Sequence, residues 1–369
     1  MPSSTLLLLS LLLLLTLSTS LHPPAPRLLI FGLGYTGTHL TTTLPKDFFG
    51  DVAATTTSGV ATRCPDFLGA VHQYAYDAPP SPALLADLRS STHVLVTAPP
   101  PPLPFMNPLP SFLSDPSLTN LTSITFLSTT GVYGDHAGQW VDEDSDCLAT
   151  EEKKEKYLYT EADFVEKVGG RVAVNILRLA GMYVGSGLCS HRVHPVNTVS
   201  LFPSISPPPR LTPLPLPLPP PSYGPGRSSL HTSLASLASL PNSPPPPPPE
   251  TPLPPEDPTS RVHVTDVCRA ISAKMDIDWK NRDATYQDPY VLNCADSHPS
   301  TRTESFTYAA ELLKIPVVPP KRTGRKGGRK RVRSDKIVEL LGELKYPSYR
   351  EGLKSVYEGE FGEGEKERV

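Results

Sequence analysis

The sequence lacks the residue patterns that mark metal sites and disulfide-stabilised folds. Its five cysteines are scattered over 369 residues, and none forms a C-x-x-C pair. Its ten histidines show no H-x-x-x-H or H-E-x-x-H spacing, and the nearest pair is His191 and His194. Structural and catalytic zinc sites need such clusters. We therefore expect no metal site, and we expect most cysteines to be small buried apolar residues.

An excess of charge of either sign is also missing. The chain has 34 lysines and arginines against 37 aspartates and glutamates, a net charge of −3. Proteins that bind nucleic acid or anionic membranes carry clustered positive charge, and we interpret the basic run 321–333 as a solvated loop. The composition therefore predicts no nucleic-acid partner, and it leaves a homodimer open; a small-molecule substrate is expected from the motifs described below.

An apolar leader without charge begins the chain. Residues 4–20, STLLLLSLLLLLTLSTS, have the shape of a signal peptide, although no Lys or Arg precedes the apolar core. The run is short for a stable membrane span. We interpret residues 1–26 as a signal-like leader, which indicates secretory entry or an organelle such as a plastid; otherwise the protein would be soluble and intracellular.

From residue 27, short apolar runs alternate with helix-like segments. Strands are predicted at 27–32, 51–58, 70–77, 92–98, 123–128 and 171–179, with helices at 36–43, 82–89, 110–119 and 151–168. This alternation predicts an α/β fold, a doubly wound parallel sheet of the Rossmann type, over 27–183. A smaller C-terminal substrate lobe, with elements that return to the Rossmann core, is predicted over 223–358. It would contain a strand entering a helix at 261–275, a strand at 290–296, and helices at 302–314 and 334–343.

The 46 prolines are concentrated in 195–260 and around 99–109. Residues 211–222, LTPLPLPLPPPS, resemble a translated polypyrimidine tract, and removing 184–223, or equivalently 183–222, joins LRLAGMY to GPGRSSL through a single tyrosine. We therefore interpret 184–222 as a disordered Pro-rich insert, and a retained intron is one hypothesis for its origin. The leader and 243–258 are also rich in Leu and Pro, so a general preference of the genome for such codons is the alternative. A Pro-rich loop is predicted at 241–260 and an acidic tail at 359–369.

The stretch RLLIFGLGYTGTHL contains the motif Gly32-x-Gly34-x-x-Gly37 between a predicted strand and helix. In a dinucleotide cradle the first glycine permits the turn, the second admits the pyrophosphate, and the third allows close packing of helix and strand. The N–H groups at the start of the helix, around Tyr35 and Thr36, would face the phosphates. The motif predicts binding of NAD or NADP; a purely structural glycine turn is the alternative.

The end of the second predicted strand favours NADP over NAD. An Asp or Glu there would bind the ribose 2′-hydroxyl of NAD, but this chain has Thr57 and Ser58, with Arg63 nearby. Asp77, at the end of the third predicted strand, is placed to face the adenine. Pro99, after the fourth, is placed to shape the wall of the ribose site.

Six further segments carry a specific resemblance: FLSTTGVYGD (126–135), GQWVDEDS (138–145), LRLAGMY (177–183), YGPGRSSL (223–230), RVHVTDV (261–267) and YPSYREGL (346–353). Together they resemble the YeeZ-like, atypical extended short-chain dehydrogenase/reductases of the NAD-dependent epimerase/dehydratase superfamily. The resemblance covers 27–183 and 223–358. It implies an NAD(P)-dependent oxidoreductase or epimerase acting on a small, sugar-like or anionic substrate.

The resemblance also implies catalytic residues, and here the chain departs from the family pattern. Thr129, with Thr130 beside it, matches the Ser or Thr that polarises the substrate. The family's Tyr-x-x-x-Lys pair is absent, because Glu161 follows Tyr157 and Asp163 follows Tyr159 at that spacing. Tyr159, Tyr157 or Tyr133 would have to supply the acid, and a carboxylate beside a phenol opposes its use as a base.

The missing pair supports a second hypothesis, a non-catalytic NAD(P)-binding sensor or scaffold. Arg178, Arg227 and Arg261 are candidates for binding an anionic group, since guanidinium groups fit phosphate in a bidentate manner. Asp266 is predicted to cap the helix that follows it. Trp140 and Arg350 belong to segments that either form a lid or are structural.

Overall fold

A computed structural model of the chain describes residues 25–44, 48–150, 152–183, 258–284, 286, 288–314 and 329–361. The first part contains β1 (Arg27–Phe31), α2 (Tyr35–Thr43), β2 (Asp51–Thr56), β3 (Val71–Gln73), α3 (Pro82–Ser90), β4 (His93–Val96), α4 (Leu109–Leu113), β5 (Ser123–Thr129), the 3-10 turn η1 (Thr130–Tyr133), β6 (Trp140–Val141), α5 (Glu152–Val168), β7 (Ala173–Leu179) and β8 (Gly181–Tyr183). The second contains β9 (Arg261–His263), α7 (Val264–Lys280), β10 (Tyr290–Cys294), α8 (Arg302–Leu312), β11 (Arg331–Val332), α9 (Asp335–Leu341) and α10 (Tyr349–Phe361).

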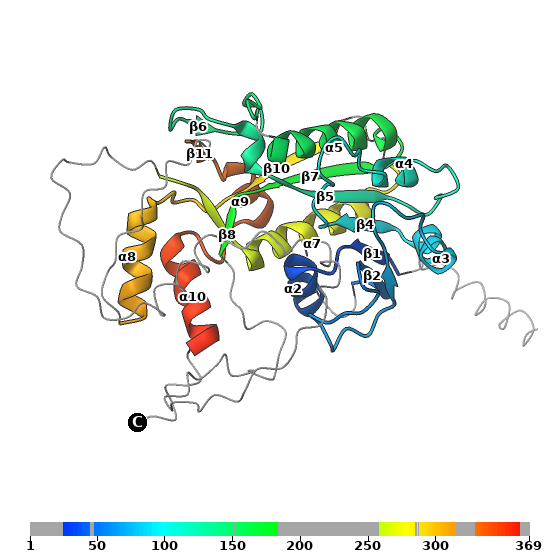
Figure 1. Ribbon diagram of the computed structural model, residues 1–369, viewed down its shortest axis with the longest axis horizontal. Coiled ribbons are helices and arrows are strands. Elements are labelled where there is room, and N and C mark those ends of the chain that lie inside the picture. The colour runs from blue at the N-terminus through cyan, green and yellow to red at the C-terminus, as the bar shows by residue number, and fades with distance from the viewer. Residues whose placement is uncertain are drawn as a thin grey trace, which may run out of the picture.

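The central sheet has seven parallel strands in the order β10-β7-β5-β4-β1-β2-β3 (Figure 1). The first strand, β1, is an inner strand of the sheet: Leu29 of β1 lies opposite Ala53 of β2 on one side and Val94 of β4 on the other. The winding direction therefore reverses between β1 and β4, which is where doubly wound sheets form their binding crevice. The predicted doubly wound α/β fold is confirmed.

Both faces of the sheet are covered by helices, which explains the continuous apolar run of β1. Leu28 and Ile30 pack into the core that contains α2, α7 and α9. Leu29 and Phe31 pack into the opposite core, with α3, α4 and α5. All four side chains are at most 1% exposed, and each contributes about 1.5–3 kcal/mol by leaving water.

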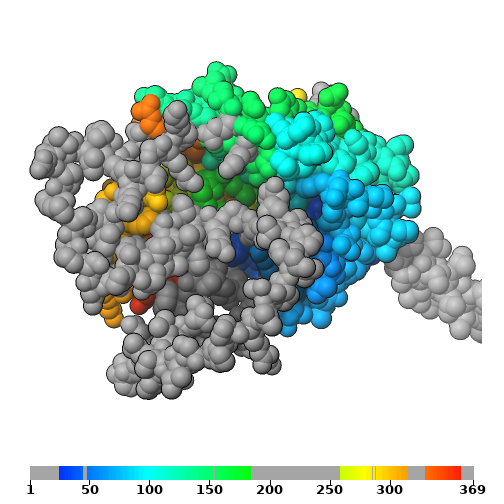
Figure 2. Space-filling model, viewed as in Figure 1, coloured from blue at the N-terminus to red at the C-terminus, as the bar shows by residue number. Residues whose placement is uncertain are grey.

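The residues after the long gap divide between the sheet and a smaller lobe. β10 extends the central sheet beside β7, and α7 packs against α2. Outside the sheet, α8 and α10 pack together around Tyr183, Phe306 and Leu353. Figure 1 shows these two helices at the side opposite β1 and β2, and the space-filling view shows the same separation of orange and blue surfaces (Figure 2).

Three of the differences from the sequence prediction have a local physical reason. α4 ends at Leu113 because Pro116 follows closely, and a proline disfavours helical geometry in the residue before it. β3 ends at Gln73 because its partner β2 ends at Thr56, so nothing remains to pair with. Part of the predicted basic loop is β11, which pairs with β6 and buries Val332.

Asp266 does not cap α7, contrary to our prediction. The N-cap is His263, whose Nδ1 accepts the backbone N–H of Thr265 at 3.2 Å. Asp266 lies in the first turn and is 1% exposed; its carboxylate accepts the backbone N–H groups of Lys345 (2.8 Å) and Tyr346 (2.9 Å). The residue therefore fastens a C-terminal loop to α7.

Several predicted features lie outside the described residues. They are the leader up to residue 24, the insert 184–222 with Cys189, Tyr223, Arg227, the Pro-rich loop up to residue 257, residues 321–328 of the basic run, and the tail from residue 362. Within the described ranges, no helix has the length and hydrophobicity needed to cross a membrane.

Candidate functional site

The candidate site lies at the carboxyl edge of β1, β4 and β5, where the sheet changes winding direction. Gly32 follows β1, Ala98 follows β4, and Thr129 ends β5. The start of α2 and the first half of α5 border the same edge (Figure 1). The elements predicted to hold a dinucleotide and those predicted to act on a substrate are thus neighbours.

Each glycine of the cradle has a distinct physical reason to be glycine. Gly32 has φ +99°, and a Cβ there would lie 2.9 Å from the backbone nitrogen of Ala98. At Gly37 a Cβ would lie 3.0 Å from the carbonyl oxygen of Gly32, so this glycine lets α2 pack against the turn. At Gly34 a Cβ would meet only the Gly32 oxygen, at 4.0 Å. The middle glycine therefore opens onto free space, as a cradle for a pyrophosphate requires.

The start of α2 is suited to a phosphate. Its N-cap is Gly34, no side chain caps it, and no acidic residue lies in its first turn. Unpaired N–H groups at such a terminus carry partial positive charge. Thr36 is 7% exposed and its hydroxyl lies 3.8 Å from Met182 Sδ, so only its backbone can face a ligand. Tyr35 is partly buried beside it.

The residues predicted to recognise the adenosine end lie in exposed loops. Thr57 and Ser58 follow β2 and are exposed, and the Ser58 hydroxyl lies 3.5 Å from the carbonyl of Val60. Asp77 is exposed and lies four residues beyond the end of β3. Pro99 is exposed after β4, and its carbonyl accepts the Tyr76 hydroxyl at 3.0 Å.

The two threonines after β5 point in different directions. Thr130 is 8% exposed, and its hydroxyl donates to the carbonyl of Leu179 on β7 at 3.3 Å. Thr129 is partly exposed, and its Oγ1 accepts the N–H of Gly131 at 3.1 Å. A Cβ on Gly131 would lie 3.5 Å from Lys154 Cδ, so a lysine stem covers this turn. Thr129 is thus the better placed of the two to meet a substrate.

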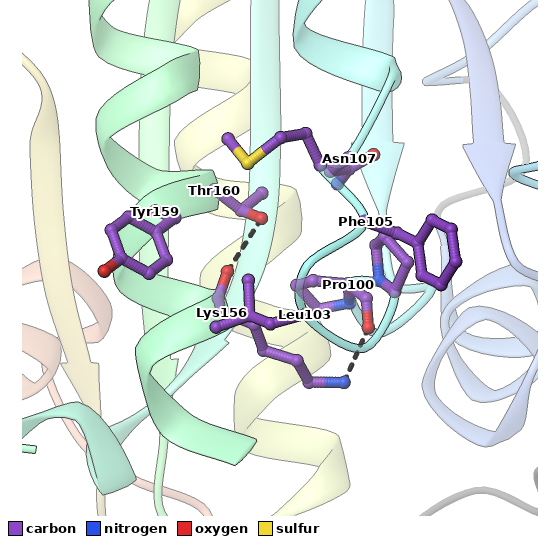
Figure 3. Close-up of a pocket in the computed structure, with 9 residues that line it drawn as sticks. Pro100, Leu103, Phe105, Asn107, Lys156, Tyr159 and Thr160 are labelled. Carbon is purple, nitrogen blue, oxygen red and sulfur yellow. Dashed lines mark hydrogen bonds between the residues drawn. The ribbon is translucent and has the colours of Figure 1, made fainter. Parts of the chain in front are cut away.

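The tyrosines of α5 are separated by the helix geometry. Tyr157 packs against the sheet, with its ring stacked on Phe126 at 6.2 Å, and burial raises its pKa. Tyr159, two residues later, is 50% exposed. Lys156, the residue before Tyr157, donates from its Nζ to the carbonyl of Pro100 at 2.6 Å (Figure 3). The sequence comparison did not identify Lys156, whose side chain reaches the loop that follows β4.

Tyr133 is held in a buried network. Its hydroxyl donates to Asn293 Oδ1 at 2.8 Å and accepts from Arg178 Nη1 at 3.0 Å. Burial raises the pKa of Tyr133 to about 12, although the nearby Arg178 guanidinium acts in the opposite direction. A phenol of that pKa with both partners in place is poorly suited to proton transfer near neutral pH.

The carboxylate of Glu161, found where the family has its lysine, lies in the same network. It binds Arg178 Nη2 at 2.7 Å and Nε at 3.3 Å, and it accepts the hydroxyl of Ser128. Burial lowers the pKa of Arg178, but the hydrogen bonds and charge of Glu161 outweigh burial and raise it overall. Arg178 is therefore neutralised inside the protein rather than presented to an anionic ligand.

Arg261, the other described arginine candidate, lies apart from these residues. It is 7% exposed on β9, with its guanidinium carbon 5.9 Å from the centre of the Tyr183 ring. Its backbone N–H and the Tyr183 hydroxyl both point to the carboxylate of Asp296, at 3.4 and 3.0 Å. Among the described residues, no cluster of three or more His, Cys, Asp or Glu side chains could hold a metal ion.

The segments considered as a lid make structural contacts. Trp140 is 42% exposed on β6, and the guanidinium carbons of Arg331 and Arg333 lie 5.2 and 5.8 Å from the centre of its ring. Arg350 lies over the rings of Tyr308 and Tyr349 on the smaller lobe. Nothing in these contacts brings either residue to Thr129.

Comparison with known proteins gives the fold. No family model matches the chain, and no curated protein matches it. Among solved structures, a functionally unknown conserved protein from Silicibacter pomeroyi is 24% identical and covers 90% of this chain and 98% of its own, with a TM-score of 0.57. UDP-glucuronic acid 4-epimerase from Bacillus cereus, in complex with NAD, is 13% identical, with coverages of 90% and 96% and a TM-score of 0.58. UDP-glucose-4-epimerase from Stenotrophomonas maltophila, with bound NAD and formylated UDP-arabinopyranose, is 16% identical, with coverages of 92% and 99% and a TM-score of 0.59. The chain therefore shares the fold of NAD-bound nucleotide-sugar epimerases.

Proposed function

We propose that the protein binds NAD(P) through the Gly32–Gly37 cradle and acts as an oxidoreductase or epimerase on a small substrate. The observation that carries the proposal is the free space at Gly34, at an uncapped helix N-terminus beside the switch point of the sheet. A bound nicotinamide would supply hydride transfer. The likeness in fold to NAD-bound epimerases supports the same assignment, and the motifs around Thr129 support the finer, YeeZ-like one.

In this proposal the cradle residues act through their backbone. N–H groups of α2 would hold the pyrophosphate, and Thr57, Ser58 and Arg63 would lie near a ribose 2′-phosphate, which favours NADP. Thr129 would donate its hydroxyl hydrogen to the oxygen borne by the substrate carbon that is oxidised or reduced. Lys154, whose stem covers the same turn, would add positive charge next to that oxygen.

A second function, a cofactor-binding sensor without turnover, has its own supporting observation. Tyr157 is stacked in the core and Tyr133 is hydrogen-bonded on both sides, so neither phenol has the environment of a catalytic acid or base. Tyr159 is the remaining candidate for a catalytic acid or base, and its side chain is exposed to solvent on α5. The chain therefore has a better case for holding the cofactor than for moving a proton.

Cofactor binding is tested by titrating NADPH and NADH into the full chain and following nicotinamide fluorescence. Gly34→Ala should fold normally, because its Cβ has room, but should lose at least tenfold in affinity, because the methyl group occupies the place of the pyrophosphate. Gly181→Ala is the matched control, since its Cβ would meet Arg261 Nη1 at an ordinary 3.6 Å. Equal affinity of both variants would contradict the proposed cradle.

Turnover is tested with Thr129. Thr129→Val removes the hydroxyl but keeps the shape, whereas Thr129→Ser keeps the hydroxyl. The enzyme proposal expects Val to abolish NAD(P)-linked turnover of nucleotide-sugar and small hydroxy-acid panels, Ser to retain it, and both to bind cofactor like the wild type. Cofactor binding with no turnover in any variant would favour the sensor.

A further inference from the structure

The turn before β5 carries a modification motif that the proposed function does not use. Asn120-Leu-Thr122 is the only Asn-x-Ser or Asn-x-Thr triplet in the sequence, and its middle residue is not proline. In a secretory lumen, the asparagine of such a triplet accepts an N-linked glycan. Because a glycan is bulky and hydrated, its asparagine must lie on the surface of the folded protein, away from contacts that the protein needs.

The side chain of Asn120 meets the condition of exposure. Asn120 and its neighbour Thr119 are exposed, while Leu118 and Leu121 are buried in the core with α3, α4 and α5 and so fix the turn at the surface. Of the large apolar side chains that are exposed in the described part of the chain, none lies within 114–122. A glycan at this turn would therefore cover polar surface only.

The hydrogen bonds of the triplet are compatible with a glycan. Asn120 Nδ2 donates to the carbonyl of Arg89 at 2.9 Å, in an exposed position. A side-chain amide has two N–H groups, and a glycan replaces only one of them. The Thr122 hydroxyl donates to the carbonyl of Thr92 at 2.7 Å in the folded protein. Transfer, which needs that hydroxyl, therefore belongs to the stage before β5 pairs with β4, while the chain enters the lumen.

The turn also lies far from the candidate site. Asn120 precedes the amino end of β5, whereas Thr129 and the Gly32–Gly37 cradle lie at the carboxyl edge of the sheet. The strand from Ser123 to Thr129 spans about 20 Å at about 3.3 Å per residue. A glycan on Asn120 would thus leave cofactor and substrate free to bind.

We propose that the chain enters a secretory lumen through its apolar leader, residues 4–20, and carries an N-linked glycan on Asn120. The leader has the shape of a signal peptide, and the exposed triplet is an acceptor that only such a route can use. The inference goes beyond the proposed function, because it does not depend on NAD(P) binding.

The modification is a group transfer from an oligosaccharide carried on a lipid diphosphate. The Asn120 amide nitrogen forms a bond to the anomeric carbon of the first sugar, and the bond from that carbon to the diphosphate oxygen breaks. The lipid diphosphate leaves with the electron pair, and the amide nitrogen loses one proton. No oxidant or reductant takes part.

The test is translation of the full chain, with its own leader, in the presence of microsomes. The wild type should show one shift in gel mobility that endoglycosidase removes, in a chain protected from added protease. Asn120→Gln and Thr122→Ala should abolish the shift, whereas Thr122→Ser should retain it. Asn281→Gln is the matched control, because Asn281 is an exposed asparagine at the end of α7 and is followed two residues later by Asp283, not by Ser or Thr.

A further variant, Asp283→Thr, makes Asn281 a second acceptor and separates the two parts of the proposal. Two shifts are expected for this variant. One shift that persists in Asp283→Thr with Asn120→Gln, and none in the wild type, would overturn the assignment of Asn120. No shift in any variant, with the chain open to protease, would overturn entry through the leader. A failure of the cofactor cradle would appear separately, as loss of NADPH binding with the glycan in place.

Discussion

Replacing Arg178 should destabilise the protein more than any surface charge substitution. Arg178 and Glu161 are 8% and 5% exposed, and the guanidinium makes two hydrogen bonds to the carboxylate and one to Tyr133. Arg178→Met keeps most of the apolar stem and leaves a buried carboxylate supported only by Ser128. Removing one partner of a buried ion pair costs about 3–5 kcal/mol, a large share of a typical stability of about 5–15 kcal/mol.

The double variant Glu161→Leu with Arg178→Met should recover part of that loss. With no charge left in the core, the remaining cost is the unpaired hydroxyl of Ser128 and imperfect packing, about 1–3 kcal/mol. Lys280→Met is the control, because its pair with Asp276 is exposed and such pairs contribute about 0.5 kcal/mol or less. Urea unfolding followed by circular dichroism measures all four proteins. A loss below about 1 kcal/mol in Arg178→Met, or a double variant no more stable than Arg178→Met, would refute the reasoning.

Three further predictions follow from titration and charge. Burial raises the pKa of Asp296 to about 7, so its contribution to stability is full below the ordinary Asp pKa and is lost as the pH rises from about 4 to 7; Asp296→Asn should remove that loss, about 4 kcal/mol, from urea unfolding measured between pH 4 and 7. Burial lowers the pKa of His93 to about 4, so stability should fall by about 3 kcal/mol as pH drops from 6.5 to 4, and His93→Gln should reduce this slope in thermal unfolding. Thr57→Asp should weaken the binding of NADPH about tenfold and that of NADH little, because the carboxylate repels the 2′-phosphate that only NADPH carries. Equal weakening of both in fluorescence titrations would contradict the placement of the adenosine ribose beside Thr57.

The sheet and the glycine cradle were predictable because both depend on local backbone requirements. Apolar runs such as LLIF can only be buried on both faces, and an alternation with helices fixes a parallel order. Gly32 and Gly37 each meet a steric condition that a residue with a side chain would strain, and Gly34 leaves open the space that a side chain would occupy. Neither feature depends on which distant side chains meet.

The arrangement of the side chains at the carboxyl edge of the sheet, in contrast, depends on contacts between residues that are far apart in the sequence. Nothing in the sequence pairs Glu161 on α5 with Arg178 on β7, or Tyr133 with Asn293 on β10. A partial signal existed for the tyrosines: Tyr157 precedes Phe164 by 7 residues and Val168 by 11, which places all three on one helix face, and Tyr159 on another. That spacing indicates the buried position of Tyr157, which the Tyr-x-x-x-Lys comparison alone does not.

The separation between backbone and side-chain requirements decides how the two proposed functions should be told apart. The cradle holds a cofactor through N–H groups and through the absence of side chains, so substitutions on α5 that remove the Tyr-x-x-x-Lys pair leave it intact. Proton transfer needs specific side chains, and here two of the three tyrosines are engaged in packing or hydrogen bonds. NAD(P)H binding is therefore expected of both an enzyme and a sensor, and the hydroxyl of Thr129 is where their predictions diverge.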